Sequence, residues 1–179
     1  MIDVRARVRA VTRVEPRVQS SRHRRLLLSA VALSTLLFSG LAQPVAASGT
    51  APTAAAEVIA AARSHLGAPY RWGTDGPRTF DCSGLVFRSF KEAREATSIG
   101  GTRKTAAGYM LAFQRRGQAS RTNGRPGDLV VYGHGSHIGI YLGNGKVISA
   151  LTSGVRVHGL RRLDVPFTEF LHTHLNATH

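Results

Sequence analysis

The chain has 179 residues, with 24 Lys and Arg against 10 Asp and Glu, which gives a formal net charge of +14. This length accommodates one domain plus an appendage, because domains take roughly 100–200 residues. A single Cys excludes a small domain held together by disulfides, and the 42% apolar fraction argues against wholesale disorder. We therefore expect one folded domain with a basic surface or tail.

The first 47 residues have the pattern of a secretory signal peptide. Arg22-His23-Arg24-Arg25 leads into an uncharged apolar run at 26–41, and Val45-Ala46-Ala47 supplies small residues after it. The run is about 16 residues long, whereas a helix needs roughly 20 to span a bilayer. This pattern favours a signal peptide over a buried core helix or an uncleaved anchor. We predict cleavage after Ala47, an exported protein and no stable membrane anchor.

After a short linker at 48–53, the apolar pattern predicts helices followed by strands within one domain at 54–179. The first helix carries an apolar stripe, formed by Val58, Ile59, Ala62 and Leu66. The predicted elements are helices at 54–66, 82–96 and 104–116, a glycine-rich loop at 67–80, and strands at 128–132, 137–142, 146–150 and 154–158. Helices followed by an antiparallel meander indicate an α+β architecture, with N-terminal helices packed on a C-terminal antiparallel β-sheet.

Cys82 lies where the glycine-rich loop gives way to the second predicted helix, in the sequence Asp81-Cys82-Ser83-Gly84. The positive end of a helix dipole stabilises a thiolate at this place, and the thiolate is the nucleophilic form of cysteine. Free cysteines are, however, most often small buried apolar residues. The residues alone therefore leave a nucleophile and an inert core cysteine equally open.

A cysteine nucleophile needs a partner that takes up and returns a proton, and His137 is the best placed of the eight histidines. It opens a predicted strand whose alternation puts His137 and Gly139 on one face. The missing side chain of Gly139 leaves room there for a substrate or a helix end. The alternative is a half-exposed histidine at a strand end. Three others fall in a C-terminal tail that we predict to be frayed: His172, His174 and His179.

Five short blocks stand in order along the chain: Leu66-Gly67-Ala68-Pro69-Tyr70, Gly73, Phe80-Asp81-Cys82-Ser83-Gly84-Leu85-Val86, Pro126-Gly127-Asp128-Leu129 and His137-Ile138-Gly139-Ile140-Tyr141-Leu142-Gly143. The Asp-Cys-Ser-Gly and His-x-Gly-Ile-Tyr blocks are the specific ones. With these blocks in register, the region at 58–157 resembles the NlpC-type cell-wall cysteine peptidases, which are bacterial papain-like enzymes. The resemblance implies a papain-like α+β fold and a catalytic domain at 54–179.

Enzymes of this family hydrolyse amide bonds in the peptide stems of peptidoglycan, commonly the bond between D-glutamate and a diamino acid. The resemblance implies that Cys82 attacks the carbonyl carbon and forms a thioester, which water then hydrolyses. His137 would stabilise the Cys82 thiolate, protonate the leaving amine and activate the water. The backbone N–H of Cys82, at the helix start, would then serve as an oxyanion donor.

The resemblance also implies four substrate-binding residues: Tyr70, Asp81, Ser83 and Arg103. Tyr70 matches a tyrosine that lines the substrate site, with an ordinary packed aromatic as the alternative. Asp81 either contacts a substrate amine or caps the helix. Arg103 lies near a family arginine, and its role in this chain stays open.

The third catalytic position departs from the family pattern, because Ser149 stands where His, Asn or Gln is usual. If Gly143-Asn144-Gly145 form a three-residue turn, Ser149 lies diagonally across from His137 on the same face. A two-residue turn would point Ser149 away. A serine hydroxyl can accept a hydrogen bond from the imidazole but holds the ring less firmly than an amide, and His158 or a water can substitute. We expect activity at a reduced rate.

The basic residues of the domain are scattered, and the densest group is Arg115, Arg116, Arg121 and Arg125. They either attract anionic wall polymers or form a solvated basic face. No aromatic residues are interleaved with them, which argues against nucleic-acid binding. The sequence contains neither a multi-Cys cluster nor a His-Glu-x-x-His helix, so it predicts no metal site.

Together these features predict a secreted, cell-wall-associated monomer that acts on peptidoglycan stem peptides without a cofactor. Two alternatives stay open at this level. One is a non-hydrolytic wall-binding relative, which only the serine at position 149 favours. The other is an amidase or acyltransferase that uses the same Cys–His pair.

Overall fold

The computed structural model describes residues 53–175. The predicted signal peptide, its cleavage site after Ala47 and residues 48–52 of the predicted linker lie outside these residues, and so does His179. Within residues 53–175, no helix is long and apolar enough to cross a membrane.

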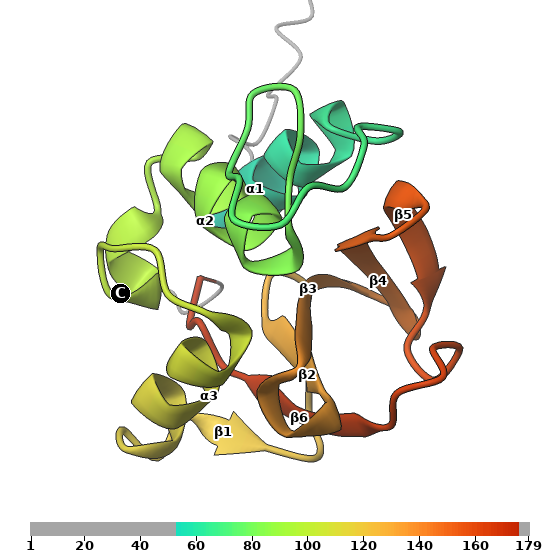
Figure 1. Cartoon of the computed structure of the whole chain (residues 1–179). Coiled ribbons are helices and arrows are strands. Elements are labelled where there is room, and N and C mark those ends of the chain that lie inside the picture. Colours follow the sequence, from blue (N-terminus) through green and yellow to red (C-terminus); the bar gives the residue numbers. More distant parts are fainter. Residues whose placement is uncertain (1–52, 176–179) are drawn as a thin grey trace, which may run out of the picture. The chain divides into compact units, whose positions relative to one another are not determined.

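Helices come first in the described chain and strands follow (Figure 1). The helices are α1 (Ala54–Ser64), α2 (Cys82–Glu92) and α3 (Ala106–Gln114), with short 3-10 helices η1 (Ala96–Ile99) and η2 (Gly133–Gly135). The strands are β1 (Ala119–Ser120), β2 (Leu129–Tyr132), β3 (His137–Gly143), β4 (Lys146–Leu151), β5 (Gly154–Gly159) and β6 (Phe167–Leu171). The predicted α+β architecture is confirmed.

Side-chain caps explain where the α-helices begin. Thr53, Asp81 and Thr105 each accept a hydrogen bond from a backbone N–H of the first turn. α2 ends at Glu92 rather than at residue 96, and Arg94 just beyond it takes a φ of 61°, which is incompatible with a continuing helix. α1 ends before Leu66, so this side chain is 46% exposed and does not extend the buried stripe as predicted.

The six strands form one sheet in the order β1-β6-β2-β3-β4-β5, with antiparallel neighbours. β2 to β5 are the predicted meander. The prediction stopped there, however, and missed β6, which pairs with the other edge of β2, and β1, which pairs with β6. The local pattern hides both strands, because β1 has only two residues and β6 does not alternate regularly between buried and exposed positions.

The segment after β6 is anchored, which corrects the prediction of a frayed tail. Asp128, which is 3% exposed, accepts hydrogen bonds from the backbone N–H of Thr173 (3.0 Å) and from Nδ1 of His172 (2.9 Å). Nε2 of His172 lies 2.8 Å from Oγ of Ser120 on β1. One buried carboxylate therefore joins the start of β2 to the segment after β6, and only then does the chain reach the exposed His174.

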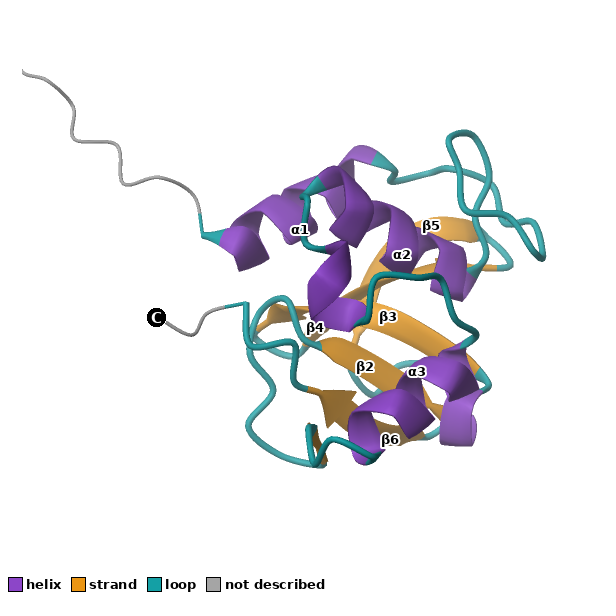
Figure 2. Cartoon of the chain, turned by 90° about the vertical axis from the view of Figure 1, so that its left-hand side faces the viewer, coloured by secondary structure: helices purple, strands orange, loops and turns teal. Residues whose placement is uncertain are grey.

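Apolar side chains cover both faces of the sheet. The larger cluster lies under the helices, where α1 packs against α2 and α2 lies over β3 and β4 (Figure 2). Ile138 and Ile140 of β3 belong to this cluster. The smaller cluster lies on the opposite face and comprises Val130, Tyr132, Val147, Phe167 and Phe170. Alternation along β3 thus directs His137, which pairs with Tyr132, toward the second face at the end of the strand.

The glycine-rich loop before α2 is packed tightly on the first turn of that helix. The carbonyl oxygen of Thr74 accepts a hydrogen bond from the backbone N–H of Asp81 (2.9 Å). A Cβ atom added at Gly84 would lie 2.0 Å from the same oxygen. Gly84 is therefore required by the close approach of two backbone segments, independently of the chemistry of the neighbouring Cys82.

We predict that Gly84→Ala lowers the free energy of unfolding by about 3 kcal/mol or more, because backbone atoms must move to relieve the overlap. Urea denaturation measures the loss. Gly108→Ala in α3 is the matched control, since a Cβ there meets only side-chain atoms of Lys104 and Thr105, the nearest at 3.2 Å. Alanine also favours a helix by about 1 kcal/mol over glycine. Equal losses in the two variants would contradict a tight contact between the loop and α2.

Candidate active site

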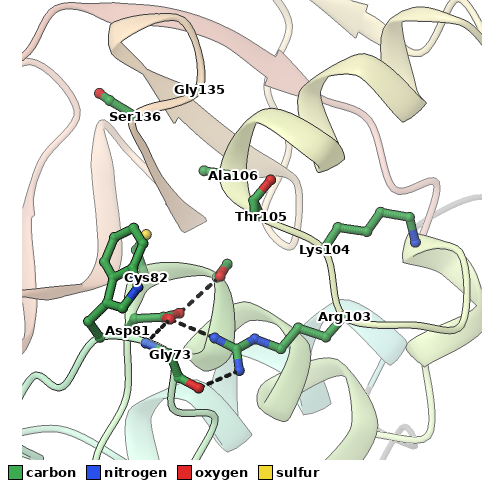
Figure 3. Close-up of a pocket in the computed structure, with 11 residues that line it drawn as sticks. Gly73, Asp81, Cys82, Arg103, Lys104, Thr105, Ala106, Gly135 and Ser136 are labelled. Atoms are coloured by element: carbon green, nitrogen blue, oxygen red, sulfur yellow. Dashed lines mark hydrogen bonds and ion pairs between the residues drawn. The ribbon is translucent and has the colours of Figure 1, made fainter.

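Cys82 is the first residue of α2 and lines a cavity of about 420 Å³. The residue is largely buried, with 8% exposed. The other lining residues come from the loop before α2, the start of α3 and the turn before β3 (Figure 3), and they are Trp72, Gly73, Asp81, Ser83, Arg103, Lys104, Thr105, Ala106, Gly135 and Ser136. Cys82 therefore belongs both to the larger apolar cluster and to the wall of a concave site.

Asp81 links the first turn of α2 to the loop before it and to Arg103. Its Oδ1 accepts hydrogen bonds from the backbone N–H of Gly84 (2.7 Å) and from the hydroxyl of Ser83 (2.9 Å). Its Oδ2 accepts from the backbone N–H of Gly73 (2.8 Å) and from Nη2 of Arg103 (2.6 Å). The capping role, one of the two predicted alternatives, is present. A substrate amine could bind this carboxylate only by displacing one of these donors.

Arg103 connects the start of the α3 segment to the loop before α2. Its Nη1 donates to the carbonyl oxygen of Gly73 (3.0 Å), while Nη2 forms the ion pair with Asp81. Figure 3 shows the guanidinium pointing at these two residues, whereas the Lys104 side chain extends the other way and donates to the carbonyl oxygen of Thr102 (3.1 Å). Within residues 53–175, no group of three or more His, Cys, Asp or Glu side chains is placed to hold a metal ion.

Tyr70 lies close to the nucleophile candidate. Its ring is partly buried and packs against the larger apolar cluster. Burial raises the pKa of its hydroxyl, and the charges of Cys82 and Asp81 raise that pKa further. The structure thus brings Tyr70 into the neighbourhood of Cys82.

Strands β3, β4 and β5 carry a row of three polar side chains. Nε2 of His137 lies 2.9 Å from Oγ of Ser149, which is fully buried. The same Oγ lies 2.8 Å from Nε2 of His158, and Nδ1 of His158 lies 3.0 Å from the carbonyl oxygen of Gly159. The structure thus contains the predicted contact between His137 and Ser149. His158 adds to Ser149 rather than substituting for it.

The turn between β3 and β4 differs from the prediction, although the pairing of the two strands is the predicted one. Asn144 and Gly145, both with positive φ, form a two-residue turn, so the predicted three-residue turn is wrong. A register shift between Tyr141 and Gly143 compensates, and Ile140 pairs with Ile148 as the predicted alignment requires. The face predicted for Ser149 is therefore right.

Tyr132 of β2 packs against both imidazoles, that of His137 on the adjacent β3 and that of His158 on the more distant β5. Its ring centroid lies 5.8 Å from that of His137 and 6.1 Å from that of His158. Tyr132 is fully buried, and its hydroxyl has no hydrogen-bond partner among residues 53–175. Burial raises the pKa of this hydroxyl, so it stays neutral. The ring therefore restricts the orientation of the two imidazoles without adding a charge.

Burial disfavours the charged forms of both Cys82 and His137. For Cys82, burial is the largest effect and raises the pKa of the thiol; a backbone hydrogen bond from Ile138 opposes it, and the charge of Asp81 adds to it. For His137, burial is again the largest effect and lowers the pKa to about 4. Among the described residues, no hydrogen bond joins the thiol to the imidazole. Burial therefore opposes the thiolate that the helix end and the imidazole are expected to stabilise.

Sequence reasoning missed Trp72, which lines the cavity and is 82% exposed. The sequence feature that could have indicated its role is that the only tryptophan of the chain stands in the glycine-rich loop, beside Gly73. It also missed Tyr132 as the packing partner of the two imidazoles. That role depends on the pairing of β2 with β3, which no single strand reveals.

A cysteine at a helix N-terminus and a histidine on a strand under that helix, in an α+β scaffold with an antiparallel sheet, define a domain of the papain-like fold class. A model of the NlpC/P60 family matches residues 67–170. The chain belongs to this family, and the family predicted from the sequence blocks is confirmed.

Two curated relatives and one solved structure illustrate the similarity. "Probable endopeptidase p60" of Listeria welshimeri is 43% identical over 108 residues, which cover 57% of this chain and 19% of the relative. A "Probable endopeptidase" of Corynebacterium glutamicum is 32% identical over 127 residues, which cover 70% of this chain and 57% of the relative. The chain thus spans about a fifth of the length of the first relative and little more than half of the second.

Among solved structures, the peptidoglycan hydrolase RipB of Mycobacterium tuberculosis superimposes with a TM-score of 0.54 at 30% identity. The match covers 67% of this chain and 64% of that structure. The predicted papain-like fold is confirmed by this likeness together with the arrangement of helices and sheet.

We predict that the alkylation rate of Cys82 by iodoacetamide keeps rising from pH 6 to pH 9 without a plateau. A raised thiol pKa leaves less thiolate at every pH below it, and only the thiolate reacts. Because Cys82 is the only cysteine, intact-mass analysis follows the reaction directly.

The control for this prediction is His137→Ala. It should leave the shape of the profile unchanged, because a neutral imidazole carries no charge that would lower the pKa of the Cys82 thiol. A plateau between pH 5 and pH 7 that disappears in His137→Ala would instead demonstrate a standing ion pair.

Proposed function

We propose that the protein is a secreted peptidoglycan hydrolase that cleaves an amide bond of the stem peptide through a thioester on Cys82. The observation that carries the proposal is the placement of Cys82 in the wall of a cavity, at the start of a helix packed on the strand that begins with His137. Family membership and the endopeptidase and peptidoglycan-hydrolase names of the relatives support the substrate class.

The proposed reaction begins with two neutral groups. His137 accepts the thiol proton as the sulfur of Cys82 forms a bond to the carbonyl carbon, and the resulting imidazolium then protonates the leaving amine as the C–N bond breaks. Water next attacks the thioester, gives one proton to His137 and releases the acid product, and the proton returns to the sulfur. Catalytic hydrogen bonds are often long in unliganded enzymes, so the thiol and imidazole need to approach only in the substrate complex.

The first turn of α2 is suited to stabilise the oxyanion of this reaction. The backbone N–H groups of Cys82 and Ser83 belong to the first turn of α2, so they have no acceptors earlier in the helix. They direct positive partial charge to the place where the carbonyl oxygen becomes negative. Arg103, whose side chain is 27% exposed in the cavity wall, offers its remaining donors to a carboxylate of the stem peptide, and Tyr70 is proposed to border the same site.

The bond between D-glutamate and a diamino acid is the proposed target. Export through residues 1–47 and location at the cell wall complete the proposal, with Arg115, Arg116, Arg121 and Arg125 as contacts for anionic wall polymers. The catalytic domain is proposed to comprise residues 54–179, and the protein to act as a monomer.

The hydrogen-bonded support of His137 favours hydrolysis over the non-hydrolytic alternative. Ser149 keeps the imidazole engaged although it is not one of the usual third residues. An amidase or an acyltransferase would use the same pair and differs only in the bond cleaved or in the acceptor, which product analysis identifies.

We predict that the purified protein converts muropeptides into two fragments whose masses identify the cleaved bond. Cys82→Ala and His137→Ala should each lower kcat by at least about 1000-fold, because removal of either member of a nucleophile–base pair disables the unit. Ser149→Ala should lose less than His137→Ala. His174→Ala, at an exposed position, is the matched control and should keep full activity.

Mass spectrometry of the products decides the outcome. Retained cleavage by Cys82→Ala would exclude Cys82 as the nucleophile. Binding of muropeptides without any cleavage would support a non-hydrolytic relative. Release of a whole stem peptide from its sugar would identify an amidase.

A further inference from the structure

The row formed by His137, Ser149 and His158 ends on a group that can only accept a hydrogen bond. The carbonyl oxygen of Gly159 has no proton, and Nδ1 of His158 lies 3.0 Å from it. Nδ1 of His158 must therefore carry a proton and donate. In a neutral His158, this proton sets the direction of every other hydrogen bond in the row.

Each following hydrogen bond is determined by the one before it. With its proton on Nδ1, a neutral His158 presents a bare Nε2, which accepts the hydroxyl proton of Ser149 across 2.8 Å. Ser149 has a single proton, so its Oγ can meet Nε2 of His137, 2.9 Å away, only as an acceptor. His137 consequently carries its proton on Nε2, and its Nδ1 is left with a free lone pair.

We propose that His158 is a positioning residue that acts through Ser149 to hold His137 in the tautomer whose Nδ1 accepts the Cys82 proton. The inference rests on the proposed function for its catalytic consequence. The pair Ser149 and His158 would thus together take the part that a single amide or imidazole plays at the third position in the family pattern.

Ser149 alone does not suffice for this task. A lone hydroxyl donates or accepts with equal ease, so it would support either tautomer of His137. Because Ser149 is fully buried, solvent is poorly placed to supply the missing direction. His158 supplies it, and the diagonal placement across β4 and β5, where Val147 pairs with His158, brings its ring within reach.

The neighbours of the row favour this arrangement. Tyr132 lies against both imidazole rings and limits their rotation, and its buried hydroxyl carries no charge. Burial lowers the pKa of His158, which keeps the ring in the neutral form that the argument needs. A protonated His158 would be unable to accept from Ser149.

The direct test is ¹⁵N NMR of the histidine rings in the resting protein near pH 7. We expect His137 of the wild type to be predominantly protonated on Nε2. In His158→Ala, the Nδ1-protonated form should rise to a substantial share, while the circular dichroism spectrum stays unchanged. An Nδ1-protonated His137 in the wild type, or an unchanged tautomer in His158→Ala, would overturn the proposal.

A double-mutant cycle tests the catalytic consequence. Ser149→Ala and His158→Ala should each lower kcat about 10- to 100-fold with little change in KM. The double variant should lose no more than either single variant, because each substitution breaks the same hydrogen-bonded pair. Ser149→Asn, whose side-chain oxygen accepts directly from Nε2, should make activity insensitive to His158→Ala. Losses that multiply in the double variant would contradict the proposal.

Arg156→Ala is the matched control, because Arg156 lies two residues before His158 on β5 and is exposed. Among residues 53–175, its side chain donates only to the backbone carbonyl of Ser153. It should preserve both the tautomer and kcat. Since the NMR measurement needs no substrate, a fixed Nε2-protonated His137 in a protein that cleaves no muropeptide would refute the proposed function and leave the positioning role intact.

Discussion

The first turn of α2 is held between the glycine-rich loop and the start of β3, and the functional side chains take their places from this contact. On the loop side, Gly84 lets the helix approach the carbonyl oxygen of Thr74, and the carboxylate of Asp81 fastens the loop to the helix. On the strand side, the backbone of Ile138 lowers the pKa of the Cys82 thiol and so acts against the effect of burial. The nucleophile candidate is thus fixed by backbone contacts rather than by its proposed catalytic partner.

The same packing decides how the proposed reaction must begin. A buried thiol and a buried imidazole both favour their neutral forms, so the helix end and the neighbouring strand do not by themselves create a thiolate. A neutral thiol reacts well only if a base takes its proton during attack. The proposed reaction therefore requires a lone pair of His137 that is correctly oriented toward the thiol. The row through Ser149 and His158 is proposed to supply that orientation.

Much of this arrangement follows from local sequence, and the rest does not. The helix start at Cys82, its cap and the face of Ser149 could be predicted, because capping residues and period-two alternation act over a few residues. Strand β6 and the anchored His172 could not, since their stability comes from pairing with β2 and from Asp128, which lie far away in the chain. The effect of burial on the pKa values of Cys82 and His137 was hidden for a similar reason, because burial is a property of the assembled fold.

The formation of a thioester on Cys82 is the central claim, and rapid quenching of the wild-type protein with purified muropeptide tests it most directly. The account predicts a transient mass increase equal to the acyl fragment, located on the peptide that contains Cys82 and released by hydroxylamine. Fragment products that accumulate with no adduct on Cys82, or with an adduct on another residue, would contradict it.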